Sequence, residues 1–144
     1  LTAAIHTRMT FDTVPTETDT TASEAFSAGH GVCQDFAHIF IAVARAVHIP
    51  ARYVSGHLFR RDGMHFQEGA HAWAEAWVED LGWVAFDAVN GISTDDAYIR
   101  VACGLDYRDA APIAGARSGG DSEELTVQVR VSEVAGQAAS QSQS

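Results

Sequence analysis

Gly29-His30-Gly31-Val32-Cys33-Gln34-Asp35 is the stretch that decides the fold, because it places a thiol where a glycine-marked loop turns into a helix. The apolar residues that follow have the spacing of one buried helix face, at Phe36, Ile39, Phe40, Val43 and Val47. This pattern predicts a helix over about residues 32–47 that ends before a proline. Cys33 then lies on the first turn, where unpaired N–H groups and the helix dipole stabilise a thiolate.

An activated thiol needs a base, and two later segments supply a histidine and a carboxylate. His71 begins the run His-Ala-Trp-Ala-Glu-Ala-Trp, and Asp87 ends the run Gly-Trp-Val-Ala-Phe-Asp. Both runs alternate like strands, so they predict an antiparallel hairpin. The chain order is therefore cysteine, histidine, aspartate.

The register of this hairpin decides whether His71 and Asp87 can meet. If Val78 pairs with Gly82, the loop has three residues and Asp87 lies opposite Trp73, diagonal to His71 and within side-chain reach. A two-residue loop would place the two side chains on opposite faces of the sheet. A histidine–aspartate pair therefore requires the three-residue loop or a bulge.

The remaining elements are predicted from capping, breaker and alternation signals. We expect a short helix within residues 1–10, a loop over 13–20, a helix from the Thr21–Glu24 capping box to Ala28, strands over 51–59 and 98–103, and a long cleft-lining connection over 60–70. The last predicted strand contains Leu125, Val127, Val129 and Val131.

Several motifs occur together in a familiar order. They are Gly31–His38, Ile49–Gly56, His71–Glu75 and Gly82–Asp87, continued by Asn90-Gly91, Tyr98–Ala102 and Gly104–Tyr107. In these motifs the chain resembles the transglutaminase-like superfamily, in particular its bacterial branch, over about residues 21–112. The resemblance implies an α+β, papain-like transglutaminase core in which the helix carrying the cysteine packs against an antiparallel β-sheet. It also implies Cys33 as nucleophile, His71 as base and Asp87 as the residue that orients the histidine.

The chemistry expected from the resemblance is acyl transfer from amide bonds of peptides or proteins. The thiolate forms a thioester acyl-enzyme, which water or an amine resolves, giving a protease, deamidase or transamidase. The backbone N–H of Cys33 is the first expected donor to the oxyanion. A non-catalytic peptide-binding or protein-binding module that retains the fold is the alternative.

Other reactive residues are expected to be structural. Cys103 is predicted to be a shielded thiol within an apolar strand and not a disulfide partner. His38 should be packed or at the surface, Asp35 should satisfy the first helical turn, and Glu75 should form a cross-strand ion pair. The three tryptophans, Trp73, Trp77 and Trp83, are expected in the core and the cleft wall. Seven histidines without ligand spacing predict neither a metal nor another cofactor.

Chain length and net charge limit the domain organisation and the kinds of partner that can be expected. The 144 residues predict one domain over 1–135 with a mobile low-complexity tail over 136–144. The formal net charge of -10 argues against nucleic acid and anionic membranes as partners and favours a neutral or cationic peptide or protein substrate. There is no membrane-length apolar run or signal-peptide pattern, so we expect a cytoplasmic location. Because the chain begins at Leu1, we expect a fragment of a longer protein; its oligomeric state is not predicted.

Overall fold

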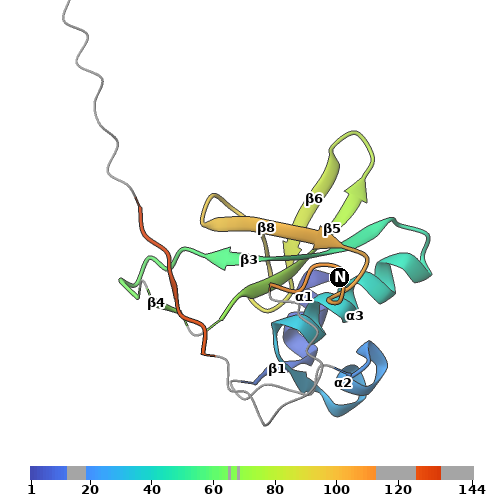
Figure 1. The fold of residues 1–144 in the computed structure, drawn as a ribbon. Helices are drawn as coiled ribbons and strands as arrows, with labels where there is room; N and C mark the ends of the chain where they lie inside the picture. Colours follow the sequence, from blue (N-terminus) through green and yellow to red (C-terminus); the bar gives the residue numbers. More distant parts are fainter. Residues whose placement is uncertain (13–18, 65, 68, 113–125, 134–144) are drawn as a thin grey trace, which may run out of the picture.

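The computed structural model describes residues 1–12, 19–64, 66–67, 69–112 and 126–133 (Figure 1). The helices of this described part are α1 (Thr2–Arg8), α2 (Ala22–Ala28) and α3 (Cys33–Ala46). Its strands are β1 (Thr10–Phe11), β2 (His30–Gly31), β3 (Ala51–Leu58), β4 (Phe66–Gln67), β5 (His71–Val78), β6 (Gly82–Asp87), β7 (Ile92–Ser93), β8 (Tyr98–Gly104) and β9 (Val129–Arg130).

The central feature is a five-stranded antiparallel sheet with the strand order β7-β6-β5-β3-β8. The three helices lie together on one side of this sheet (Figure 1). Two short ladders, β1 with β2 and β4 with β9, lie outside it. The α+β class predicted from the sequence is therefore confirmed, with the cysteine-bearing helix packed on an antiparallel sheet.

Helix α3 packs closely on β5 because the residues of β5 that face it are small. Ala72, Ala74 and Ala76 are buried in the same core cluster as the apolar face of the helix. Phe36, Ile39 and Phe40 are buried as predicted, but Val43 is 43% and Val47 61% exposed. The buried stripe of the later turns passes instead through Ile41 and Ala44, four and seven residues after Ala37. This stripe, at i, i+4 and i+7, lies to one side of the predicted one on the helix surface.

The hairpin has the register that a contact between His71 and Asp87 requires. Val78 pairs with Gly82 and Ala74 with Phe86, so the turn has three residues. The turn is permitted by left-handed backbone at Asp80 and Gly82, with φ of 67° and 82°. Strand β6 ends at Asp87, where the chain turns.

Two other predictions need correction or lie outside the described residues. The last strand was expected over 125–131, but β9 contains Val129 and Arg130, which pair with Gln67 and Phe66 of β4. Leu125, most of the 13–20 loop and the predicted tail 136–144 lie outside the described residues. Within the described part, no helix is long and apolar enough to cross a membrane.

Candidate active site

Cys33 is fixed on the first turn of α3 by the residues on either side of it. The Asp35 carboxylate accepts a hydrogen bond of 2.9 Å from the N–H of Val32, the residue before the helix. Gly31 makes room for that carboxylate, since a Cβ at this position would lie 2.6 Å from Asp35 Oδ2. The expected role of Asp35 is confirmed, and the half-buried thiol of Cys33 is held at the loop-to-helix turn.

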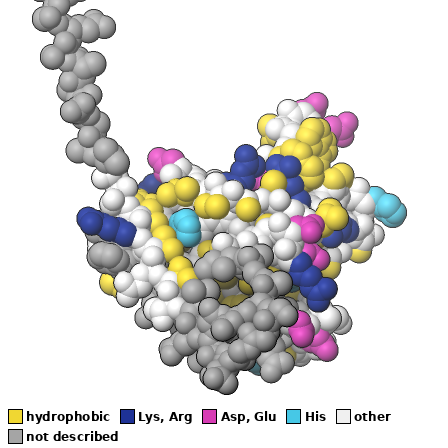
Figure 2. All heavy atoms as spheres, viewed as in Figure 1, with side chains coloured by type: hydrophobic (Ala, Val, Ile, Leu, Met, Phe, Trp, Pro, Cys, Tyr) yellow, Lys and Arg dark blue, Asp and Glu magenta, His cyan; other side chains and the backbone are white. Residues whose placement is uncertain are grey.

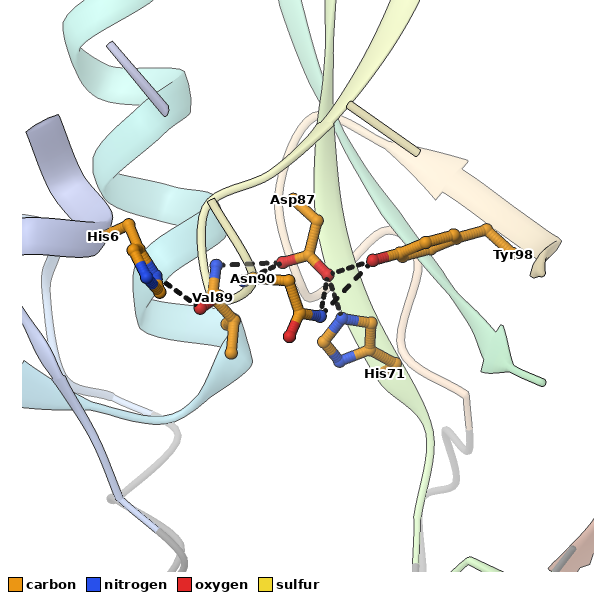
Figure 3. A network of polar contacts seen from close by, with 6 residues as sticks. All are labelled: His6, His71, Asp87, Val89, Asn90 and Tyr98. Carbon is orange, nitrogen blue, oxygen red and sulfur yellow. Dashed lines mark hydrogen bonds and ion pairs between the residues drawn. The ribbon is translucent and has the colours of Figure 1, made fainter. Parts of the chain in front are cut away.

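His71 and Asp87 meet across the hairpin at the ends of β5 and β6 (Figure 3). The distance from His71 Nε2 to Asp87 Oδ2 is 2.7 Å, and the two side chains are 14% and 0% exposed. Because a carboxylate oxygen accepts, Nε2 carries the proton in this bond. The diagonal contact expected from the three-residue turn is present.

Cys33 acts on the same imidazole, because it is among the groups that shift the pKa of His71. Burial alone would lower the pKa of His71, but the hydrogen bonds and negative charges of Asp87 and Cys33 raise it to about 9. Since Nε2 is held by Asp87, Nδ1 is the ring nitrogen left for the thiol. At neutral pH the imidazole is therefore protonated, the form required for a thiolate–imidazolium pair.

Asp87 is a buried charge whose oxygens are satisfied by several donors. Tyr98 Oη and Asn90 Nδ2 each lie 2.7 Å from Oδ2, and the N–H groups of Val89 and Asn90 lie 2.9 and 3.3 Å from Oδ1. Burial would raise the pKa of Asp87, but the hydrogen bonds from His71, Tyr98 and Asn90 and the charge of His71 lower it below its ordinary value. The carboxylate therefore stays ionised beside the imidazolium.

Sequence reasoning gave Asn90 and Tyr98 no role at the site. The role of Asn90 could have been predicted locally, because an Asn-Gly pair three residues after an aspartate marks a turn. In such a turn the donors of the asparagine point toward the carboxylate of the aspartate. Tyr98 had none, because it reaches Asp87 from β8 through tertiary pairing of the sheet. Behind the turn, His6 Nδ1 of α1 donates to the carbonyl oxygen of Val89 at 2.8 Å (Figure 3).

Glu75 and His38 have the structural roles expected of them. Glu75 is buried between Arg52 and Arg100, with nitrogen–oxygen distances of 2.6 and 3.0 Å. Arg52 lies directly across the β3–β5 ladder, so the cross-strand ion pair is confirmed. His38 packs on Tyr53 with ring centroids 5.2 Å apart.

The three tryptophans differ in how deeply they are buried. Trp73 is buried as expected, but Trp77 and Trp83 are 49% and 40% exposed and pack edge to face on the hairpin. Figure 2 shows hydrophobic side chains on this projecting hairpin and basic side chains near its base. There the Arg52 guanidinium lies 4.1 Å from the centroid of the Trp83 ring. Core burial was therefore a wrong prediction for these two residues, because the hairpin extends beyond α3.

The predicted shielding of Cys103 is also wrong. Its side chain is exposed, because β8 is an edge strand of the sheet. Cys33 and Cys103 are both free thiols, as expected. Among the described residues there is no group of three or more histidine, cysteine, aspartate or glutamate side chains arranged to hold a metal ion.

Comparison of the sequence with known proteins identifies relatives over most of its length. The family model of the transglutaminase-like superfamily matches residues 1–88, a range that includes Cys33, His71 and Asp87. The uncharacterised protein ML0607 of Mycobacterium leprae is 39% identical over 139 residues, covering 92% of this chain and 49% of that protein. Rv2569c of Mycobacterium tuberculosis is 36% identical over 124 residues, covering 80% and 40%. The chain thus spans half or less of these relatives.

Solved structures share the fold. A proposed cysteine protease from Cytophaga hutchinsonii superposes with a TM-score of 0.67 at 29% identity, over 87% of this chain and 45% of that one. Calcium-bound LapG of Legionella pneumophila gives a TM-score of 0.57 at 16% identity, over 81% and 69%. The LapG likeness concerns the fold alone, whereas the first neighbour also shares sequence.

Proposed function

The chain belongs to the transglutaminase-like superfamily, and on this premise we propose that it is a cysteine-dependent enzyme acting on amide bonds of peptides or proteins. The observation that carries the proposal is the buried hydrogen bond between His71 and Asp87, together with a Cys33 thiol that acts on the same imidazole. A binding module needs neither a thiol on a helical first turn nor a buried carboxylate behind the imidazole. The likeness to a proposed cysteine protease adds support.

In the proposed reaction, Cys33 Sγ attacks the amide carbonyl carbon as the thiolate. The N–H of Cys33, which has no partner within its own helix, donates to the developing oxyanion. His71 gives its proton to the departing amine as the carbon–nitrogen bond breaks, leaving a thioester. His71 then takes a proton from water, the resulting hydroxide displaces the thiolate, and a carboxylic acid is released.

Asp87 supports both proton transfers. It fixes the tautomer of His71 by accepting from Nε2, and its charge stabilises the imidazolium. An amine could replace water in the second half of the reaction and give a cross-link. We propose hydrolysis as the main outcome, since amine transfer would require a second substrate site.

The proposal is tested with a synthetic peptide library containing glutamine and asparagine amides, with and without an added primary amine, in isotope-labelled water. Mass spectra distinguish peptide cleavage, deamidation with incorporation of labelled oxygen, and amine adducts. The chain has no lysine, so it offers no ε-amine of its own. Activity in the wild type and in Cys103→Ala, but not in Cys33→Ala, is expected. Turnover that persists in Cys33→Ala would rule out the thiol mechanism, and no reaction in any form would favour the binding module.

A further inference from the structure

Three side-chain donors converge on a single oxygen of Asp87. His71 Nε2, Tyr98 Oη and Asn90 Nδ2 each lie 2.7 Å from Oδ2 (Figure 3). The other oxygen, Oδ1, accepts from the backbone N–H groups of Val89 and Asn90. The tyrosine and asparagine therefore share the oxygen on which the catalytic pair of the proposed function depends.

We propose that Tyr98 is a positioning residue whose hydroxyl shares Asp87 Oδ2 with His71, so that the imidazolium is stabilised but still able to release its proton to a leaving amine. This inference rests on the proposed function for its catalytic meaning. Its physical content, the sharing of one oxygen between two donors, is independent of any substrate.

The hydroxyl is suited to this task because it remains a donor. Burial and the neighbouring Asp87 raise the pKa of Tyr98 above its ordinary value, so the phenol keeps its proton throughout the working range of a thiol enzyme. A hydrogen bond donated to a carboxylate oxygen offsets part of its negative charge. The hydrogen bond that the same oxygen accepts from a second donor is therefore weaker. Loss of the hydroxyl should therefore strengthen the bond from His71 and raise the pKa of His71 above about 9.

The carboxylate should not rotate when this hydroxyl is removed. Oδ1 remains held by the amides of Val89 and Asn90, and Asn90 Nδ2 still donates to Oδ2. The tyrosine ring packs edge to face on buried Trp73, with centroids 5.3 Å apart, and lies 6.1 Å from the His71 ring. Tyr98→Phe keeps these ring contacts and removes the hydroxyl alone.

The charged and titratable groups around the pair come from each neighbouring element. Cys33 on α3 and Asp87 on β6 act on His71, and Asp95, just before β8, acts on Tyr98. His6 of α1 contacts the carbonyl of Val89 behind Asp87. Tyr98→Phe changes the charge of none of these groups, so a change in the titration of His71 reports the lost hydrogen bond.

The test is an NMR titration of the His71 ring in the whole chain for the wild type, Tyr98→Phe and Tyr107→Phe. Tyr107 is the matched control, because its ring packs on Tyr53 and its backbone N–H donates to His38, away from Asp87. We expect the His71 pKa to rise in Tyr98→Phe and to be unchanged in Tyr107→Phe. A second variant, Asn90→Ala, removes the other side-chain donor and should shift the titration in the same direction. An unchanged or lowered His71 pKa in Tyr98→Phe would overturn the proposal.

A second readout separates this role from simple structural support. In a Cys103→Ala background, alkylation of Cys33 by iodoacetamide at neutral pH should persist in Tyr98→Phe, because the imidazolium is more stable. Peptide turnover should fall by about 3–10-fold, because that imidazolium is a weaker acid. A parallel loss of alkylation and turnover would indicate a structural role and contradict the proposal. If the wild type has no turnover but the titration shifts, the proposed function fails while the sharing of Oδ2 stands.

Discussion

At the scale of single residues, the site is built around a charge with no access to solvent. Asp87 is fully buried, and an isolated carboxylate there would be costly. Among the described residues that donate to Asp87, His71 can itself carry a positive charge, whereas the donors from Val89, Asn90 and Tyr98 are neutral. The neutral donors hold the carboxylate in place, and His71 adds the compensating charge.

The first prediction concerns that charge. Asp87→Asn should lower the pKa of His71 from about 9, because the amide has no charge to stabilise the imidazolium. Turnover should fall by about 10²–10⁴-fold, since the amide can also present its NH₂ group to Nε2 and favour the wrong tautomer. An NMR titration of His71 and the kcat for the best library peptide measure the two effects. A variant with normal kcat would make Asp87 a purely structural residue.

The second prediction is a pH dependence of stability from the same pair. The folded-state pKa of His71 is raised to about 9, above the unfolded value of about 6.5. The folded state thus binds more protons between these values, so the stabilisation is fully present below pH ~6.5 and is lost as pH rises through about 9. Urea unfolding across this window should show a decline that is smaller in His71→Ala. Parallel curves for the two proteins would refute the expectation.

At the scale of elements, local rules predicted the two units that carry the site. The helix start near Cys33 followed from periodicity, and the hairpin followed from the alternation of side chains along two strands. Its Val78–Gly82 pairing is the register that a contact between His71 and Asp87 requires. Predictions failed where a partner distant in sequence decides the outcome. Cys103 is exposed because β8 lies at the sheet edge, and Trp77 is exposed because the hairpin extends past the helix. The contact of Tyr98 with Asp87 likewise depends on the strand order.

The third prediction tests the turn that leads into α3. In Gly31→Ala the new Cβ would displace the Asp35 carboxylate, which then loses its bond to the Val32 N–H. We expect a loss of about 1–3 kcal/mol in the free energy of unfolding, with reduced turnover as Cys33 shifts. Gly69→Ala is the matched control, because a Cβ there has no neighbour within 4 Å. Equal urea midpoints for the two variants would show that the close approach at Gly31 does not matter.

At the scale of the whole molecule, the excess of negative charge is the property that an approaching substrate meets first. The formal net charge is -10. Several arginines of the described residues are already paired with carboxylates: Arg52, Arg60, Arg61 and Arg100. The positive charge of these arginines is thereby offset locally, and the excess of carboxylates over arginines makes the long-range field negative.

The fourth prediction follows from this field and concerns the choice of substrate. Two peptides that share the reacting amide but carry flanking lysines or flanking glutamates should differ in kcat/KM, in favour of the cationic one. The difference should be largest near 10 mM salt, where the Debye length is about 30 Å, and shrink toward 150 mM, where it is about 8 Å. The kcat values should stay similar, because charge far from the reacting bond affects encounter and not chemistry. Stopped assays at both salt concentrations measure these constants. A preference for the cationic peptide that does not change with salt would locate the discrimination in direct contacts at the cleft and not in the field of the molecule.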